Sequence, residues 1–219
     1  MNVDLRLYAV VDPAVNGGRT LPDLAQRIAG SATLVQLRDK YGSTRAMIEE
    51  ARALEAVLSP AGVPLLINDR VDVALAAQAD GVHIGQDDMS AADARLLLGR
   101  TAIIGLSIKT VEQAKAAPLE YLDYVAIGGV YATTSKDDAS APIGIAGLRA
   151  VAGAIRARDP KCPICAISGI NASNAGDVIG AGADGVAVIS ALSLAPDPAT
   201  AAQHLRSVVD VALRRRGRP

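Results

Sequence analysis

Short apolar runs recur along the chain, and each is followed by a cluster of Gly, Asn, Asp or Ser and then by a segment with helical spacing. The runs are continuous rather than alternating, which is typical of strands whose two faces are both buried. They lie at residues 7–11, 34–37, 64–67, 82–84, 102–106, 124–127, 164–167 and 186–189. The pattern therefore predicts eight parallel strands that are connected by helices.

The connecting segments are rich in Ala, Leu and Arg, and the helical spacing is clearest at residues 45–58, 91–98 and 148–157. A further helix is predicted at 201–213, near the end of the chain. Strand and helix in repeated alternation imply right-handed parallel crossovers. We therefore expect an α/β fold in which residues 1–219 form a single parallel (β/α)₈ TIM barrel. An open, doubly wound sheet is the alternative.

Composition narrows the class of protein. The chain has no Trp and no Phe, so its core is expected to consist of Val, Ile, Leu and Ala, which suits the tight interior of a barrel. A net charge of -1 gives no reason to expect binding to nucleic acid. No apolar run approaches the roughly 20 residues of a membrane span, and the charged residues among the first six do not resemble a secretory signal. A cytoplasmic protein with small-molecule partners is expected, and a homo-oligomer is compatible with the sequence.

The two cysteines, Cys162 and Cys165, form a Cys-x-x-Cys pair. A zinc site would need two more ligands, and the only histidines are His83 and His204. The pair also falls at the start of a predicted buried strand rather than at the start of a helix. We predict two buried small side chains, without a metal or redox role.

Polar residues follow almost every predicted strand. At the end of the second strand, Gln36, Arg38 and Lys40 alternate with other residues, so their side chains project to one side and form an anion receptor. Asp69 follows the third strand and Asp88 the fourth, and neighbouring strand ends meet in a barrel. Two carboxylates beside an anion receptor suggest Mg²⁺ that bridges to a phosphate.

Asp87 is an alternative to Asp88 as a ligand, because spacing does not separate the two. The later strand ends offer hydroxyl groups and glycines that suit phosphate, notably after the seventh and eighth strands. Residues 131–141 form the longest polar connection on this face, and we expect them to close over the substrate.

Taken in order, these motifs closely resemble the thiamine phosphate synthase family over essentially the whole chain. The matching residues are Gln36-x-Arg38-x-Lys40, Asn68-Asp69, His83-Ile84-Gly85-Gln86-x-Asp88, Gly105-x-Ser107, Thr133-x-Ser135-Lys136 and Gly182-Ala183-Asp184-Gly185-Val186-Ala187-Val188. The resemblance implies an enzyme that joins hydroxymethylpyrimidine diphosphate to a thiazole phosphate, releases pyrophosphate and uses Mg²⁺.

The resemblance also implies roles for individual residues. The pyrimidine diphosphate would be held by Gln36, Arg38, Lys40, Asn68, Ser107 and Lys136, of which Arg38, Lys40, Ser107 and Lys136 would be catalytic. Mg²⁺ would be held by Asp69 and Asp88, and the thiazole phosphate by Thr133, Ser135, Gly169, Ile189 and Ser190, the last three partly through the backbone. The reaction that the resemblance implies is a Mg-assisted dissociative substitution, in which Mg²⁺ and the cationic side chains stabilise the leaving pyrophosphate. The thiazole nitrogen attacks with its own lone pair, so no general base is required.

The chain departs from the family pattern at three places. Gly129 and Ala132 stand where proline is frequent, and Ser168 stands where glycine is usual. Lys109 replaces a histidine that follows the fifth strand in many relatives. Thiazole tautomerase paralogues use a histidine near that position and lack the metal carboxylates, so the synthase is favoured over this alternative. His83 is expected to pack at a strand end or to support a catalytic group.

A third possibility is a barrel that binds thiamine phosphate without catalysis. Such a protein would be expected to lack Lys40 or the carboxylates Asp69 and Asp88, and all three are present.

Overall fold

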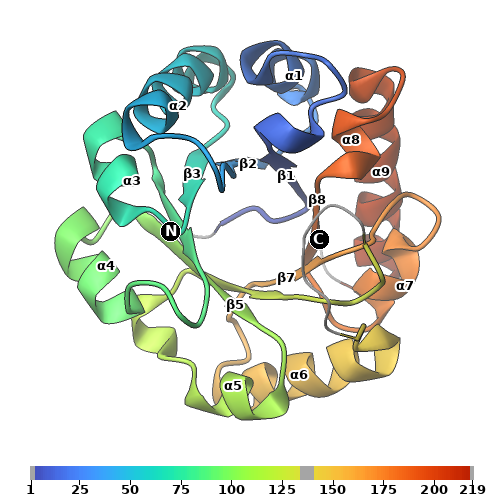
Figure 1. The fold of residues 1–219 in the computed structure, drawn as a ribbon. Coiled ribbons are helices and arrows are strands. Elements are labelled where there is room, and N and C mark those ends of the chain that lie inside the picture. The colour runs from blue at the N-terminus through green and yellow to red at the C-terminus, as the bar shows by residue number, and fades with distance from the viewer. Residues whose placement is uncertain (1–2, 134–140, 218–219) are drawn as a thin grey trace.

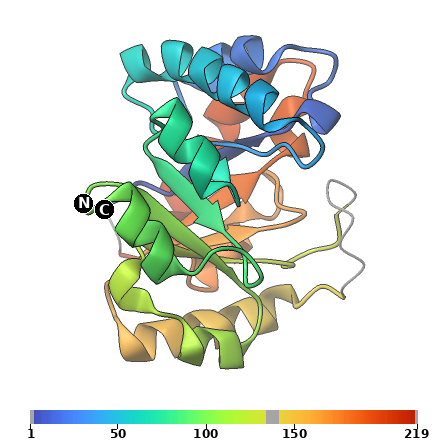
Figure 2. The same ribbon diagram turned by 60° about the vertical axis from the view of Figure 1, so that its left-hand side comes forward.

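The computed structural model describes residues 3–133 and 141–217. Within these ranges, eight parallel strands follow one another around the sheet in chain order, and the last pairs with the first to close a barrel. Figure 1 shows the helices as a ring around the strands, and Figure 2 shows them packed along the outside of the barrel. The closed parallel barrel confirms the predicted fold class and excludes the open sheet.

The strands are β1 (Leu7–Val11), β2 (Leu34–Leu37), β3 (Leu65–Asn68), β4 (Gly81–Ile84), β5 (Ile103–Ile108), β6 (Tyr124–Ile127), β7 (Ile164–Ile167) and β8 (Gly185–Val188). The predicted bounds are correct for β1, β2, β6 and β7 and differ by one or two residues for the others. Strand β5 continues past its predicted end, so Ser107 lies in the strand itself.

The α-helices are α1 (Leu21–Ile28), α2 (Thr44–Leu58), α3 (Val71–Ala77), α4 (Ala91–Leu98), α5 (Val111–Ala116), α6 (Gly144–Arg158), α7 (Ala175–Gly180), α8 (Ser190–Ser193) and α9 (Pro198–Arg215). Short 3₁₀ helices are η1 (Pro13–Val15), η2 (Ser59–Ala61) and η3 (Leu119–Tyr121). A Ser or Thr side chain accepts a backbone N–H at the start of α1, α2, α4 and α5, which fixes where each helix begins after its loop.

Each strand is buried on both faces, which explains the continuous apolar runs. In β1, Leu7, Ala9 and Val11 belong to the large cluster between strands and helices, whereas Tyr8 and Val10 belong to a second cluster inside the barrel. The interior departs from the predicted aliphatic composition, because Tyr8 and Tyr124 are its largest side chains and both are almost completely buried.

The two cysteines lie on opposite sides of the barrel wall, as a spacing of three in an extended chain requires. Cys162 packs in the outer cluster and Cys165 in the interior cluster. Both are buried, as predicted, and both are free thiols. Burial raises the pKa of the Cys162 thiol to about 11, so the thiol stays protonated and unreactive near neutral pH.

A repeated contact holds the amino-terminal ends of the strands. The residue before each even-numbered strand accepts a backbone N–H near the start of the preceding odd-numbered strand. The pairs are Thr33 with Leu7 at 3.1 Å, Asp80 with Leu65 at 2.8 Å, Asp123 with Ile104 at 2.8 Å and Asp184 with Ile164 at 3.0 Å. These contacts fix the stagger between neighbouring strands and therefore the positions of their opposite, carboxyl ends.

Among the described helices, none is both long enough and apolar enough to cross a membrane.

Candidate active site

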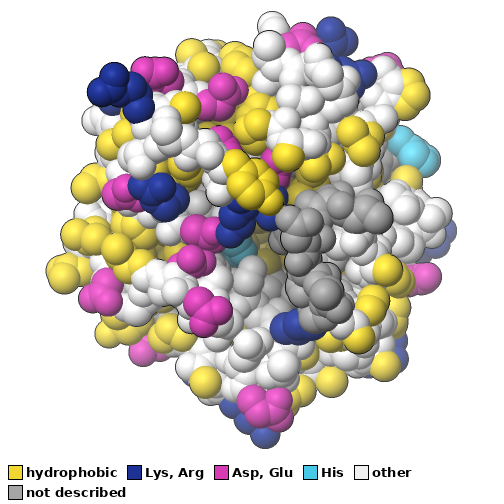
Figure 3. Space-filling model, in the orientation of Figure 1, with side chains coloured by type: hydrophobic (Ala, Val, Ile, Leu, Met, Phe, Trp, Pro, Cys, Tyr) yellow, Lys and Arg dark blue, Asp and Glu magenta, His cyan; other side chains and the backbone are white. Residues whose placement is uncertain are grey.

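A cavity of about 570 Å³ opens in the middle of the barrel at the carboxyl ends of the strands, within the size range of small-molecule sites. We call it the central cavity. It is lined by Tyr8, Gln36, Arg38, Lys40, Tyr41, Asn68, Asp69, His83, Gly85, Asp88, Ser107, Ala126, Ile167 and Ala187. Figure 3 shows basic, acidic and histidine side chains gathered near the middle of one face of the molecule.

The three side chains predicted to form an anion receptor all reach this cavity. Gln36 is buried, and its amide nitrogen donates to the Tyr8 hydroxyl. The Arg38 guanidinium forms an ion pair with Asp12, and the Lys40 ammonium forms one with Asp69. The alternation along the sequence therefore placed these groups correctly.

Sequence reasoning missed Asp12, which follows β1 directly. Its side chain is almost fully buried, and one carboxylate oxygen accepts the Ala14 N–H at 2.9 Å to begin η1. The other oxygen is bonded to Arg38. The sequence contained a signal for Asp12, because this residue directly follows a predicted strand, as do polar residues that were predicted to form the site. By pairing with Arg38 it fixes where that guanidinium points.

Asp69 and Asp88 meet at the ends of β3 and β4, as predicted. The Asp69 backbone N–H donates to the His83 carbonyl at 2.8 Å, which continues the β3–β4 pairing by one residue. Asp69 has a left-handed φ of 62°, a conformation that Asp tolerates better than most residues and that turns its carboxylate toward the cavity. Asp88 accepts the Gly85 N–H at 2.6 Å.

The Asp69 carboxylate is close enough to Asp88 to affect the ionisation of Asp88. Loss of hydration is the main cause that raises the pKa of Asp88, and the adjacent Asp69 carboxylate raises it further, against the opposing effects of the Gly85 N–H and Lys40. A pair of acidic oxygens that repel each other beside a phosphate receptor is the donor set that a hard cation neutralises. Asp87, the alternative ligand, is absent from the residues that line this cavity.

The described part of the chain contains no group of three or more His, Cys, Asp or Glu side chains that could hold a metal by themselves. Two carboxylates fit Mg²⁺ nevertheless, because this ion is usually held by one or two protein carboxylates and completes its shell with water and substrate oxygens. Asp69 and Asp88 are the residues that would hold it.

Asn68 and Ser107 complete the predicted set on this side of the barrel, and both line the central cavity. The Ser107 hydroxyl lies 2.8 Å from the Nε2 atom of His83, whose side chain is buried. His83 therefore supports a residue that was predicted to bind substrate, as expected from the sequence. Ser135 and Lys136 lie outside the described residues, as does most of the segment 131–141 that was expected to close over the substrate.

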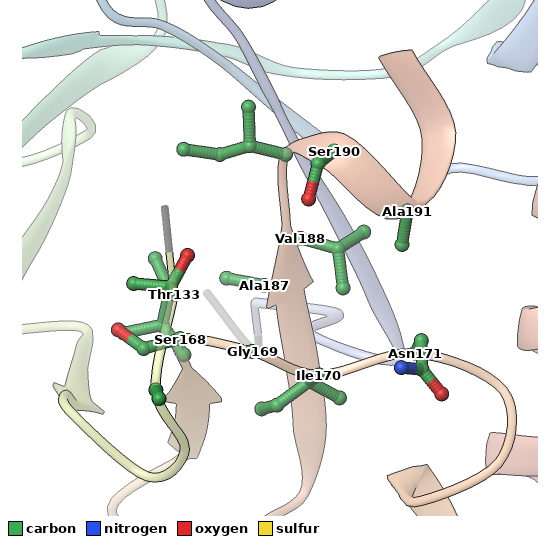
Figure 4. Close-up of a pocket in the computed structure, with 12 residues that line it drawn as sticks. Thr133, Ser168, Gly169, Ile170, Asn171, Ala187, Val188, Ser190 and Ala191 are labelled. Carbon is green, nitrogen blue, oxygen red and sulfur yellow. The ribbon is translucent and has the colours of Figure 1, made fainter. Parts of the chain in front are cut away.

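A second cavity, of about 460 Å³, lies beside the ends of β7 and β8, and we call it the β7–β8 cavity. It is lined by Ala132, Thr133, Ile167, Ser168, Gly169, Ile170, Asn171, Ala187, Val188, Ile189, Ser190 and Ala191. Figure 4 shows Thr133 and Ser190 on opposite sides of this cavity, with Gly169 and Ile170 along a third side. The four predicted thiazole phosphate residues that the structure describes are therefore brought together.

Gly169 is required by the geometry of this cavity. Its φ is +66°, and a Cβ atom there would lie 2.5 Å from the Ala132 carbonyl oxygen. The Asn174 side chain donates to the Gly169 carbonyl at 2.9 Å and holds the turn. The backbone can thus approach a bound group closely, as phosphate-binding turns do.

The two cavities adjoin, because Ile167 and Ala187 line both of them. Molecules bound in the two cavities would therefore meet beside Ile167 and Ala187. Fold and cavities together define a TIM-barrel enzyme whose site lies at the carboxyl ends of the strands, where barrel enzymes have their active sites. One half of the site is strongly charged, and the other is formed by turns and hydroxyl groups.

Comparison with known proteins names the family. The sequence profile of thiamine monophosphate synthase matches residues 7–192. The chain is 50% identical over 210 residues to the thiamine-phosphate synthase of Chloroflexus aurantiacus, covering 95% of this chain and 94% of that one. It is 49% identical over 215 residues to the thiamine-phosphate synthase of Agrobacterium fabrum, covering 98% of each.

The solved structure of thiamine phosphate pyrophosphorylase from Pyrococcus furiosus superposes with a TM-score of 0.83 at 34% identity and covers 97% of this chain and 98% of that chain. The chain therefore belongs to the thiamine monophosphate synthase family, and it is an enzyme of thiamine phosphate synthesis. The comparisons favour this activity over the tautomerase and the non-catalytic barrel that the sequence left as alternatives.

Proposed function

We propose that the central cavity binds hydroxymethylpyrimidine diphosphate, that the β7–β8 cavity binds a thiazole phosphate, and that the two react where the cavities adjoin. The observation that carries this assignment is the unequal charge of the two halves. Arg38 and Lys40 line the central cavity together with a pair of carboxylates, a set suited to a diphosphate that arrives with a divalent cation. The β7–β8 cavity has hydroxyls and a glycine turn, which suit a single phosphate.

On this proposal Asp69 and Asp88 hold Mg²⁺, which when bound neutralises charge on the diphosphate and so favours its departure. Arg38 is held by Asp12 and contacts the same diphosphate, while Lys40 leaves Asp69 when the anion arrives. Asn68 contributes an amide at the end of β3. Lys136, outside the described residues, is proposed as a further cation.

In the β7–β8 cavity, Thr133 offers a hydroxyl, and Gly169 offers backbone that carries no side chain of its own. Ile189 and Ser190 begin α8, and the first-turn N–H groups of a helix have no acceptor within the helix. These groups are proposed to hold the thiazole phosphate, together with Ser135, which is not among the described residues.

The chemistry needs no general base. The bond between the pyrimidine methylene carbon and the diphosphate oxygen breaks, and pyrophosphate leaves with the electron pair. The thiazole nitrogen then uses its lone pair to form the new carbon–nitrogen bond. The chain's contribution is to hold the two molecules in line and to stabilise the negative charge of the leaving group with Arg38 and Lys40.

The test mixes purified protein with both substrates and measures thiamine phosphate and pyrophosphate. Equal amounts of the two products are expected with Mg²⁺, and neither is expected in EDTA. Arg38→Ala should raise the KM of the pyrimidine diphosphate and leave that of the thiazole phosphate unchanged, whereas Thr133→Val should do the reverse. Full activity in EDTA would refute the metal role, and a reversed KM pattern would refute the assignment of the two cavities.

A further inference from the structure

The connection between β1 and α1 reaches across to α8, the short helix that follows β8. The Arg19 guanidinium donates to three backbone carbonyls, those of Ser193 at 3.1 Å, Ala195 at 3.1 Å and Pro196 at 3.2 Å. Ser193 is the last residue of α8, and the other two lie in the segment that leads to α9. The last carbonyls of a helix have no N–H partner within it, so Arg19 supplies donors that the helix lacks.

The backbone of this connection also lies directly against α8. Gly17 has a φ of +62°, and a Cβ atom there would lie 2.5 Å from the Ser193 carbonyl oxygen and 2.7 Å from Nη1 of Arg19. Gly18 has a similar φ of +78°, but a Cβ atom there would meet nothing within 4 Å. The Asn16 side chain accepts the Gly18 N–H at 2.9 Å and holds the turn. Gly17 therefore permits the close approach to α8, whereas Gly18 serves only the turn.

One turn of α8 connects this contact to the β7–β8 cavity. The N–H and the hydroxyl of Ser193 both donate to the Ile189 carbonyl at 3.0 Å, and Ser193 is almost completely buried. Ile189 and its neighbour Ser190 line the β7–β8 cavity. Because α8 has only four residues, it has few hydrogen bonds of its own. Packing against its neighbours and contacts such as that of Arg19 therefore fix where it lies.

Arg52 makes a contact of the same kind in another part of the molecule. Its guanidinium donates to the Ala76 carbonyl at 3.0 Å, near the end of α3. Among the described residues, those that line the two cavities include none from α3. The two arginines thus have similar chemistry, but only the contact of Arg19 leads to a wall of the site.

We propose that Arg19 is a positioning residue for the thiazole phosphate, because by holding the end of α8 it sets where the backbone of Ile189 and Ser190 lies in the β7–β8 cavity. This inference rests on the proposed binding of the thiazole phosphate in that cavity. The same connection begins at Asp12, whose carboxylate pairs with Arg38 of the central cavity. One connection thus supports both halves of the site, and its two ends should affect different substrates.

The first experiment measures steady-state kinetics for both substrates. Arg19→Ala should raise the KM of the thiazole phosphate about tenfold, because bound groups tolerate little displacement, and should leave kcat and the KM of the pyrimidine diphosphate unchanged. Arg19→Lys should raise it only about threefold, since an ammonium keeps the charge but lacks the fork that reaches three carbonyls. Arg52→Ala is the matched control and should change neither KM. Equal rises in both KM values, or the same rise in Arg52→Ala, would overturn the proposal.

A pair of glycine variants tests the same contact without a change of charge, should Arg19→Ala fail to fold. Gly17→Ala and Gly18→Ala both place a side chain on left-handed backbone, so they share that cost. Only Gly17→Ala brings a Cβ atom against the Ser193 oxygen, so it alone displaces α8. It should raise the KM of the thiazole phosphate, and Gly18→Ala should not. Equal effects on this KM would show that the turn matters rather than its contact with α8, and would overturn the proposal.

Thr133→Val separates this proposal from the one on which it rests, because Thr133 lines the same cavity but follows β6 rather than β8. If Thr133→Val raises the KM of the thiazole phosphate and Arg19→Ala does not, the assignment of the cavity holds and the role of Arg19 is wrong. If neither variant changes this KM, the thiazole phosphate does not bind in the β7–β8 cavity, and the proposed function fails together with the inference.

Discussion

At the amino-terminal ends of the strands, Asp80, Asp123 and Asp184 each bond to the backbone of a neighbouring strand, whereas at the carboxyl ends Asp69 and Asp88 face one another. Asp123 also pairs with Arg95, and Asp184 with Arg156 and Arg216. Asp123 and Asp184 have both their charge and a hydrogen bond satisfied within the protein, and the Asp80 carboxylate accepts the Leu65 N–H. Asp69 and Asp88, by contrast, are two acidic groups in contact with one partly exposed lysine between them.

The difference shows how one residue type serves stability at one end of a barrel and chemistry at the other. A carboxylate with two cationic partners and a backbone N–H gains nothing from a ligand, because its interactions are already made. A pair of carboxylates that repel each other gains most when a cation or its complex binds. Substitutions at the two ends should therefore separate stability from activity.

The largest effect on activity is expected at the carboxyl end. Asp69→Asn or Asp88→Asn should lower turnover by at least about 100-fold, because the shape is kept while the charge that is proposed to hold Mg²⁺ is lost. The melting temperature should change little. Asp87→Asn is the matched control, and full activity in either of the first two variants would contradict the assigned metal role.

The largest effect on stability is expected at the amino-terminal end. Asp184→Ala removes the carboxylate that pairs with two half-buried guanidinium groups and accepts the Ile164 N–H, so the free energy of unfolding should fall by about 2–4 kcal/mol. Chemical denaturation measures this change, and Glu120→Ala, at an exposed site, serves as the control. The kcat of the folded protein should stay close to that of the unaltered chain. A large loss of kcat would contradict the separation of stability and activity between the two ends of the barrel.

Asp12 combines features of both ends, because it lies at the carboxyl end of β1 but is buried and paired with Arg38. Its substitution should therefore affect both stability and activity. Asp12→Ala should cost about 1–3 kcal/mol of stability, because Arg38 loses its partner, and should raise the KM of the pyrimidine diphosphate roughly tenfold. Asp12→Asn keeps an oxygen for the Ala14 N–H and loses only the charge. It should therefore retain η1 but show the same rise in KM, as steady-state kinetics would reveal.

The smallest effect concerns Glu55 on α2, which has a buried carboxylate oxygen without a hydrogen-bond partner among the described residues. Loss of hydration and, to a lesser degree, Asp80 raise the pKa of Glu55 to about 7. The folded chain thus keeps a proton between about pH 4.5 and 7 that the unfolded chain has lost, so stability falls as pH rises through this window.

Glu55→Gln removes this penalty and should raise the free energy of unfolding at pH 8 by about 1 kcal/mol, less than the full shift implies because the side chain is partly exposed. No gain is expected at pH 4, where both states are protonated. Glu49→Gln, at an exposed position of the same helix, should have no such pH-dependent effect. Urea denaturation at the two pH values decides the matter.

The sequence by itself determined the strands, the order of strand and helix, and the end of the barrel where polar groups gather. Spacing alone placed Gln36, Arg38 and Lys40 on one side and brought Asp69 near Asp88, because side chains alternate along a strand and parallel strands end together. These properties depend on neighbours in the chain or on a repeated topology, so a linear pattern records them.

The tertiary structure alone decided which distant groups touch. Asp12 pairs with Arg38 across 26 positions, and the hydroxyls of Tyr8 and Tyr124 meet across 116. Such contacts depend on the stagger of the strands and on closure of the barrel, which bring inward-facing side chains of all strands into one small space. No local periodicity encodes that arrangement. The hydrogen bonds that link Gln36, Tyr8, Tyr124, His83 and Ser107 inside the barrel exist only because the barrel is closed.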